Sequence, residues 1–352
     1  MATKEEILHN FDPSGIGVDN GNLLGLPFDC ESANIIVFGI PWEVTVSYGC
    51  GTAAGPQRVL EASRQLDLYD FDYPDGWKEG IFMYEIPSHI QQKNEIFRQD
   101  AAKIIEHMEQ GGLVEDNPDL VQVLENINQE CIAVNQWLFA QATAAMNQGK
   151  QVAVIGGDHS VPLGYFQALA QRYPEFGILH IDAHADLREA YEGFQFSHAS
   201  IMFNVLQLPQ VSKLVQVGIR DVSFDEINLI EQSEGRVSAY YDRMLKQKLY
   251  AGITWLELCK QIVAELPQQV YISFDVDGLD PKLCPHTGTP VPGGLELEQA
   301  FCLFREVVDS GRQIIGFDLC EVGNDEWDGN VGARAVYKLC NLMSLSRQKL
   351  FK

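Results

Sequence analysis

Short apolar runs rich in β-branched residues alternate with longer helical patterns from Asn34 onward. Such alternation is typical of a parallel sheet that is covered by helices on both faces. Strands are predicted at residues 35–39, 151–155, 177–181, 213–217, 269–274 and 313–317, and helices at 55–62, 131–148, 162–173, 255–265, 297–309 and 333–345. The pattern therefore predicts one doubly wound, three-layer α/β domain with a central, mostly parallel sheet.

Two stretches fall outside this alternation. Residues 1–33 contain glycine and aspartate without clear periodicity and are interpreted as an N-terminal extension of a main domain at 34–352. Residues 87–130 are acidic and helix-prone, with a break at Gly111-Gly112, and are interpreted as a helical insertion. A lid, an oligomer contact and a plain surface excursion remain open as roles for either stretch.

Composition narrows the class of protein. The 352 residues are 46% hydrophobic and 21% charged, which allows a substantial core. The net charge of −24 argues against binding to nucleic acid or anionic membranes and would attract metal ions and cationic substrates, although solubility alone explains it equally well. Neither a signal peptide nor a membrane span is predicted, and eight scattered cysteines without a C-x-x-C pair suit reduced thiols. We therefore expect a cytoplasmic protein.

Acidic and histidine-containing turns follow four of the predicted strands. Their sequences are Gly-Gly-Asp-His-Ser at 156–160, Asp-Ala-His-Ala-Asp at 182–186, Asp-Val-Asp-Gly-Leu-Asp-Pro at 275–281 and Asp-Leu-Cys-Glu at 318–321. The carboxyl ends of the strands in an open parallel sheet share one edge, where ligands bind. The four turns are therefore predicted to converge, although they lie far apart along the chain.

Carboxylates gathered in this way need cations, because like charges in close contact raise one another's pKa and destabilise the fold. Strand-like alternation places Asp182, His184 and Asp186 on one face, and Asp275 and Asp277 repeat the pattern. Two imidazoles with several carboxylates and no thiolate suit Mn²⁺ and also admit Ni²⁺, Co²⁺, Fe²⁺ or Zn²⁺. A lone Asp-x-His is usually a solvated loop and a lone Asp-x-Asp usually caps a helix, but their combination after buried strands predicts a site for two ions.

These motifs resemble the three signatures of the ureohydrolase family, which includes arginase, agmatinase, guanidinobutyrase, formimidoylglutamase and guanidine hydrolase. The third signature is Ser-Phe-Asp-Val-Asp-Gly-Leu-Asp-Pro at 273–281, and the resemblance extends to 51–56 and 287–294, so that it covers about 35–345. It implies an arginase-like fold and a hydrolase of C–N bonds in linear amidines. In such an enzyme two divalent ions activate a water that releases urea from a guanidino compound.

The resemblance implies a full set of metal ligands and bridging by two of the aspartates. One ion would be bound by His159, Asp182, Asp186 and Asp275, and the other by Asp182, His184, Asp275 and Asp277. Asp182 and Asp275 would then bridge the two ions, with Mn²⁺ expected first and Ni²⁺ as the alternative.

Two further residues match catalytic positions of the family, and a third residue supports one of them. His198 matches a histidine that relays protons to the leaving amine, with a packed histidine as the alternative. Glu321 matches a carboxylate that holds the guanidinium by paired hydrogen bonds, supported by Thr289, with a salt-bridged surface glutamate as the alternative. Together with the ligand Asp186, His198 and Glu321 form the predicted catalytic set.

The predicted substrate is agmatine-type, with free guanidine second and arginine or guanidinobutyrate after it. Arg188 stands where arginases have an Asn-containing loop for the amino-acid head group, so an agmatinase-like or guanidine-hydrolase-like member is favoured, although Arg188 could still meet an α-carboxylate. Trp327 follows Glu321 closely enough to cover a guanidinium face, and an ordinary packed or surface tryptophan is an equal alternative.

The sequence leaves two other classes of protein to compare with this prediction. A deacetylase-like hydrolase on the related single-zinc fold is disfavoured, because the motifs supply ligands for two ions. A silent subunit of a hetero-oligomer is the non-enzymatic alternative, but such a subunit is expected to have lost ligands, and none is lost. The resemblance also implies a homo-oligomer, either a trimer or a hexamer, that takes a small cationic guanidino compound as its substrate.

Overall fold

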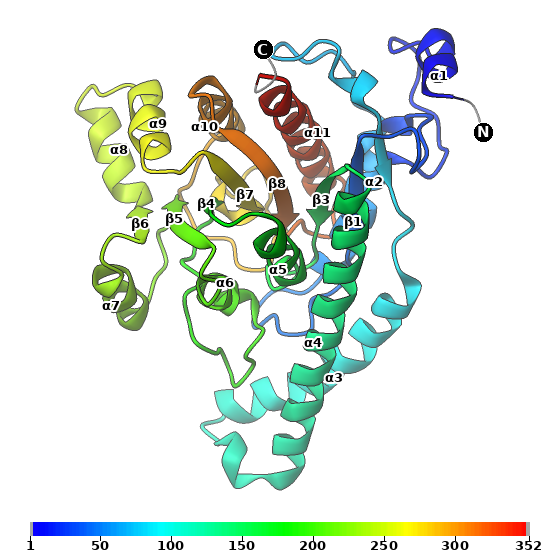
Figure 1. The fold of residues 1–352 in the computed structure, drawn as a ribbon. Coiled ribbons are helices and arrows are strands. Elements are labelled where there is room, and N and C mark those ends of the chain that lie inside the picture. The colour runs from blue at the N-terminus through cyan, green and yellow to red at the C-terminus, as the bar shows by residue number, and fades with distance from the viewer. Residues whose placement is uncertain (1–2, 350–352) are drawn as a thin grey trace.

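Eight strands form the centre of the protein in a computed structural model that describes residues 3–349. They are β1 (Ile35–Gly39), β2 (Ile81–Met83), β3 (Gln151–Ile155), β4 (Phe176–Ile181), β5 (Val211–Val217), β6 (Val237–Tyr240), β7 (Gln269–Asp275) and β8 (Gln313–Cys320). Their order is β2-β1-β3-β8-β7-β4-β5-β6, and every pair in this order is parallel. Helices cover both faces of the sheet (Figure 1), so the predicted doubly wound α/β fold is confirmed.

The two edge strands, β2 and β6, are not among the predicted strands. β2 has only three residues, and β6 has one buried residue followed by three half-buried ones. An edge strand pairs on one side only and does not need a continuous apolar run, so the hydrophobic pattern carries little signal for it. The six inner strands lie at the predicted positions because they are buried almost throughout.

The helices within residues 3–349 are α1 (Lys4–Asn10), α2 (Gly55–Ser63), α3 (Ser88–Glu109), α4 (Pro118–Asn147), α5 (Leu163–Arg172), α6 (Ile201–Leu206), α7 (Phe224–Gln232), α8 (Asp242–Tyr250), α9 (Trp255–Ala264), α10 (Leu297–Asp309) and α11 (Glu326–Lys349). α4 starts before its predicted position, because the side chain of Asn117 accepts the N–H groups of Asp119 and Leu120 and Pro118 lies in the first turn. None of these helices is long and apolar enough to cross a membrane.

The stretch 87–130 contains α3 and the first part of α4. Figure 1 shows the two helices side by side and projecting beyond the sheet. They are joined through a turn at Gly111, whose φ of 83° suits glycine. α4 then continues to Asn147, and its last part contacts β3 and α5. The stretch is therefore continuous with a helix of the core.

Asn22 and the residues next to it pack along the edge strand β2. The side-chain amide of Asn22 donates to the carbonyl of Ile81 at 2.9 Å, and its oxygen accepts the N–H of Met83 at 2.9 Å. Leu23 and Leu26 are buried in the same segment. Asn22 therefore takes the hydrogen-bonding place of a further strand and covers this edge of the sheet.

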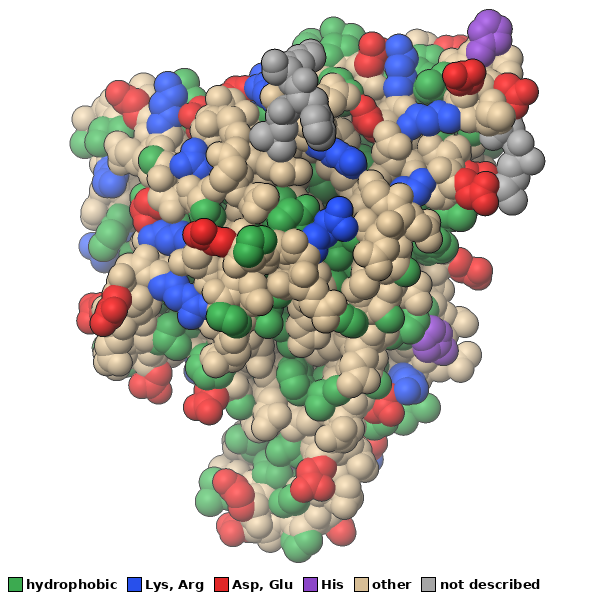
Figure 2. Space-filling view, viewed as in Figure 1, with side chains coloured by type: hydrophobic (Ala, Val, Ile, Leu, Met, Phe, Trp, Pro, Cys, Tyr) green, Lys and Arg blue, Asp and Glu red, His purple; other side chains and the backbone are tan. Residues whose placement is uncertain are grey.

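Charged side chains are mixed over the surface. On the face shown in Figure 2, lysine and arginine side chains stand singly among acidic and neutral ones rather than in a continuous patch. This distribution agrees with a chain that has 25 basic and 49 acidic residues.

Candidate metal centre

The structure brings together the turns that follow β3, β4, β7 and β8. These strands are neighbours in the order β3-β8-β7-β4, so their carboxyl ends place the four turns along one edge. Two glycines allow the first turn to pass close to its neighbours. A Cβ on Gly156 would lie 2.5 Å from Sγ of Cys320, and one on Gly157 would lie 2.0 Å from the carbonyl oxygen of Trp42. The Gly-Gly pair therefore lets His159 enter the site.

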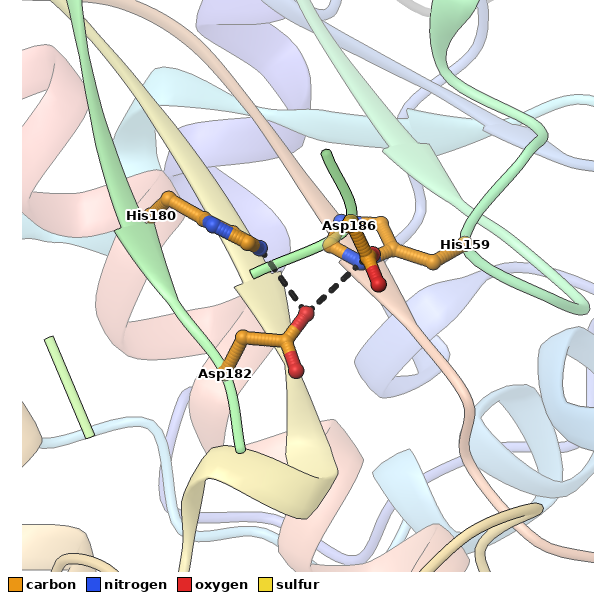
Figure 3. A group of neighbouring side chains, drawn as sticks. All are labelled: His159, His180, Asp182 and Asp186. Atoms are coloured by element: carbon orange, nitrogen blue, oxygen red, sulfur yellow. Dashed lines mark hydrogen bonds and ion pairs between the residues drawn. The ribbon is translucent and has the colours of Figure 1, made fainter. Parts of the chain in front are cut away.

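Three carboxylates gather around His159. Its Nδ1 lies 3.1 Å from Oδ2 of Asp182, 3.0 Å from Oδ2 of Asp186 and 3.4 Å from Oδ2 of Asp275. Figure 3 shows Asp182 between His159 and His180, with Asp186 beside the ring of His159. All of these side chains are buried. We call them, without His180, the His159 group.

A second group, the His184 group, consists of His184, Asp277 and Asp182. Nδ1 of His184 lies 3.0 Å from Oδ2 of Asp277 and 3.4 Å from Oδ1 of Asp182. The backbone orders this group, because Ala183 N–H donates to Asp277 at 2.9 Å and Asp277 N–H donates to Oδ1 of Asp275 at 2.8 Å. Asp182 is therefore shared between two adjoining clusters of potential ligands.

The buried carboxylates carry more negative charge than the surrounding protein neutralises. Burial, followed by the charges of Asp277 and Asp182, raises the pKa of Asp275 well above its usual range. Burial alone lowers the pKa of an imidazole, but Asp277 and Asp182 outweigh it and raise the pKa of His184 to about 12. Divalent cations would relieve the same repulsion that these protons relieve. The residues present therefore fit a dinuclear metal centre with imidazole and carboxylate ligands.

A buried hydrogen-bond chain orients His159. Its Nε2 lies 2.9 Å from Oγ of Ser273, and that hydroxyl donates to Oδ2 of Asp318 at 2.9 Å. Because the hydroxyl proton goes to Asp318, Oγ accepts from Nε2–H, and Nδ1 faces the three carboxylates. Burial lowers the pKa of His159, but the hydrogen bonds and charges of Asp182 and Asp186 outweigh it and raise this pKa well above its usual range, so a metal ion would displace a proton from Nδ1. Ser273 is not among the predicted site residues, although it lies two residues before Asp275 and so shares its face of the strand.

His180 is a second site residue that the sequence analysis missed. Its Nε2 lies 2.8 Å from Oδ2 of Asp182, and its Nδ1 lies 3.0 Å from Nε2 of Gln216. Gln216 also donates to the carbonyl of Ala185 at 2.7 Å, which assigns the NH₂ end of the amide. Nδ1 of His180 is therefore an acceptor, and Nε2–H donates to Asp182. The sequence does contain a signal for His180, because it stands two residues before Asp182 and extends the alternation of the metal motif toward the N-terminus.

A cavity of about 170 Å³ opens beside the two groups. The predicted site residues that line it are His184, Asp186, Arg188, His198 and Thr289. The hydroxyl of Thr289 donates to Oδ2 of Asp277 at 3.3 Å, so this wall of the cavity is tied to the His184 group.

The cavity has further lining residues that the sequence analysis missed, among them Tyr191, Asp221 and Glu226. Nε of Arg188 lies 4.0 Å from Oε2 of Glu226, and its guanidinium lies 4.9 Å from the ring centroid of Tyr191. Single polar residues in loops carry no periodic pattern, so only the fold reveals that they meet.

Glu321 directly follows β8, is buried and is not among the residues that line the cavity. Its Oε1 accepts the N–H of His159 at 2.9 Å, while Oε2 has no hydrogen-bond partner among residues 3–349. A Cβ on Gly288 would lie 2.9 Å from Oε2, so the backbone can approach this buried oxygen only because residue 288 is glycine. The φ angle of Glu321 is 64°, and such strain in a non-glycine residue is concentrated at functional sites. Burial, followed by the charge of Asp158, raises the pKa of Glu321 well above its usual range.

The structure does not bring Trp327 to the cavity. Its side chain, at the start of α11, is 52% exposed, and its indole N–H donates to the carbonyl of Lys282 at 3.3 Å. The next residue, Asp328, accepts the backbone N–H of His286 at 3.0 Å and holds this helix start in place. Trp327 is therefore not among the residues that line the cavity.

Comparisons with known proteins agree on one family. The family model described as "Arginase family" matches residues 33–343. The chain is 29% identical over 317 residues to an N(1)-aminopropylagmatine ureohydrolase of Thermus thermophilus (90% of this chain, 92% of the relative), and 26% identical over 293 residues to an agmatinase of Bacillus anthracis (83% and 84%). The solved agmatine ureohydrolase of Thermoplasma volcanium has the same fold, with a TM-score of 0.67 and 24% identity over 99% of this chain and 98% of that chain. The chain therefore belongs to the arginase family and is a hydrolase that acts on amidino C–N bonds.

Proposed function

We propose that the protein hydrolyses a small guanidino compound of the agmatine type and releases urea, with two divalent metal ions as cofactors. The observation that carries this proposal is the sharing of Asp182 between the His159 and His184 groups beside a small cavity. When bound, such ions supply Lewis acidity and lower the pKa of a water molecule to near neutrality. We assign one ion to His159, Asp182, Asp186 and Asp275, and the other to Asp182, His184, Asp275 and Asp277, with Mn²⁺ first and Ni²⁺ as the alternative.

His198 is the candidate proton carrier. Burial, followed by the positive charges of His184 and His159, lowers the pKa of His198 to about 4, so its ring is neutral near pH 7. A neutral imidazole that borders the cavity can accept a proton and deliver it to the leaving amine. Oγ of Ser197 lies 3.3 Å from Nδ1 of His198 and restricts the orientation of the ring.

Glu321 is the candidate acceptor for the guanidinium. One of its oxygens accepts the N–H of His159, and the buried Oε2 has no partner among residues 3–349, so Oε2 is the candidate acceptor for an N–H of the substrate. The planar guanidinium presents its N–H groups as a fork, so a fixed carboxylate also orients the carbon that is attacked. Thr289, through its bond to Asp277, would keep that ligand in place while the substrate binds.

The size and charge of the cavity favour a short cationic substrate. A volume of about 170 Å³ is well below the roughly 300 to 1,000 Å³ of sites for drug-sized ligands. Asp221 and Glu226 line it and would attract the distal ammonium of an amine-type substrate. Two of the relatives are named for agmatine or its aminopropyl derivative. Agmatine is therefore the first candidate.

Free guanidine is the second candidate and would lead if the N-terminal extension covered the mouth. The lining residues of the cavity come from positions 47–289, and none comes from 3–33 or from 87–130. Arginine and guanidinobutyrate follow, because Arg188 could meet a carboxylate. The nearby Glu226 already offsets part of its charge, which favours the amine-type substrate.

The test is urea release from agmatine, guanidine, 4-guanidinobutyrate and arginine by protein loaded separately with Mn²⁺ and Ni²⁺. We expect the highest kcat/KM for agmatine. A preference for arginine of about tenfold or more would overturn the substrate assignment, and activity confined to guanidine would favour the second candidate. Protein that binds no ions and releases no urea from any of the compounds would favour a silent subunit.

A further inference from the structure

Two loops form much of the mouth of the cavity, and neither contains a helix or a strand. The loop 40–51 after β1 contributes Ser47, and the loop 182–197 after β4 contributes Tyr191 and leads into His198. Irregular loops have few backbone hydrogen bonds of their own. Their shape therefore depends on contacts with neighbouring elements.

Helix α3 holds the loop after β1 through a buried asparagine. Oδ1 of Asn94, a residue that is only 6% exposed, accepts the backbone N–H of Glu43 at 2.7 Å. The carboxylate of Glu43 in turn accepts the N–H groups of Gly51 at 2.7 Å and Ala53 at 3.1 Å, which closes the loop on itself. Asn94 therefore fixes the position of Glu43, the residue around which this loop is organised.

Helix α4 holds the loop after β4 through a second asparagine, which is half-buried. Oδ1 of Asn128 accepts the backbone N–H of Gln195 at 3.1 Å. One turn earlier on the helix, Leu124 lies against Gly193, whose added Cβ would meet Cδ2 of the leucine at 2.9 Å. Tyr191 is bonded within the same turn by both its N–H and its carbonyl. The turn that presents Tyr191 to the cavity is therefore seated on α4.

The two helices are tied to each other close to these contacts. Lys93 is next to Asn94 in α3, and Glu130 lies two residues after Asn128 in α4. Nζ of Lys93 lies 2.5 Å from Oε2 of Glu130. Ile90 of α3 and Ile127 of α4 are buried. Helices α3 and α4, which project beyond the sheet in Figure 1, thus contact both mouth loops without lining the cavity.

We propose that residues 88–130 form a buttress that holds both mouth loops in the geometry needed for turnover, with Asn94 and Asn128 as its positioning residues. This inference rests on the proposed function, because it assigns the buttress to hydrolysis of the same guanidino substrate. Loss of either Oδ1 removes the acceptor of a loop N–H and lets that loop move. A displacement of about 1 Å in a substrate-positioning group can reduce turnover about 100-fold.

The experiment compares Asn94→Ala and Asn128→Ala with the acceptor-retaining Asn94→Asp and Asn128→Asp in Mn²⁺-loaded protein. The matched controls are Gln92→Ala and Gln129→Ala, which change exposed neighbours on the same helices. We expect kcat/KM for agmatine to fall about 10- to 100-fold in the alanine variants, to recover in the aspartate variants and to stay unchanged in the controls, with the metal content constant throughout.

Backbone hydrogen exchange separates the two contacts. Asn94→Ala should speed exchange in residues 42–53 only, and Asn128→Ala in residues 189–197 only. If the alanine variants match their controls in both kcat/KM and hydrogen exchange, the proposed role of the buttress is overturned. If an alanine variant does not fold, Asn94→Ser or Asn128→Ser tests the same hydrogen bond. If the unaltered protein releases no urea from any guanidino compound, the proposed function fails, and the exchange measurement alone decides whether the helices hold the loops.

Discussion

Nε2 of His180 lies 2.8 Å from Oδ2 of Asp182, the carboxylate that the two ligand groups share. The amide of Gln216 fixes the tautomer of this histidine, so its N–H points at the carboxylate. Asp182 is therefore held in one orientation by His180 before any metal ion binds. A ligand that is already oriented loses less conformational freedom when a metal binds.

His180→Ala should weaken metal binding without removing any ligand. The expected loss is about 10- to 100-fold in affinity, the usual effect of removing a partner that orients a ligand. Metal content per chain after equilibration with graded concentrations of a chelator measures it, and His9→Ala, which changes an exposed histidine, is the matched control. Equal affinities of the two variants would show that Asp182 does not need this partner.

Asp275→Ala should abolish urea release and lower the metal content. The substitution removes a carboxylate that lies 3.4 Å from Nδ1 of His159 and that accepts the N–H of Asp277 at 2.8 Å, so the His159 group loses a member and the His184 group loses the acceptor that orients Asp277. Asp67→Ala, at an exposed aspartate, should leave both quantities unchanged. Full activity with two bound ions in Asp275→Ala would contradict the ligand assignment.

His198→Ala should keep both ions and slow turnover by about 10²- to 10⁴-fold, the usual contribution of a positioned proton-transfer group. The ring borders the cavity but belongs to neither ligand group, which separates this variant from the ligand substitutions. Metal analysis and a pH–rate profile measured on the same preparation check it. If rate and profile both stay the same, His198 has a packing role.

Metal binding should strengthen as the pH rises through about 7. Burial, followed by the charge of Asp182, raises the pKa of Asp186 to about 7, and a metal must displace that proton. Below about pH 4 the Asp186 carboxyl is protonated in both the folded and the unfolded chain. Between about pH 4 and 7 it is ionised in the unfolded chain but still protonated in the folded one, so the stability of the metal-free fold decreases as the pH rises.

The increase in Tm produced by Mn²⁺ should therefore be larger at about pH 8 than at about pH 5. Melting curves with and without Mn²⁺ at the two pH values measure this difference. Asp186→Asn, which cannot ionise, should show a weaker dependence on pH. The same increase in Tm at both pH values in the unaltered protein would contradict the assignment of Asp186 as a ligand.

The hydrophobic pattern was sufficient for the inner strands and for the edge at which the motifs meet. Those strands are buried on both faces, which requires continuous apolar runs, and parallel pairing sends their carboxyl ends to the same edge. Alternation through Asp182, His184 and Asp186 then indicated which side chains share a face. These features depend on local periodicity and on parallel strand pairing, which leaves few alternative arrangements of the sheet.

Only the tertiary structure decided which residues support the site. Gln216 reaches His180 from a neighbouring strand, and Asn94 and Asn128 reach loops that are far away in sequence, so no local pattern marks them. Trp327 lies close to Glu321 along the chain, yet the bond of its indole to the carbonyl of Lys282 leaves it outside the cavity wall. Periodicity reports which face of an element is buried, whereas the direction of a single polar side chain depends on the partners that the folded chain brings within hydrogen-bonding distance.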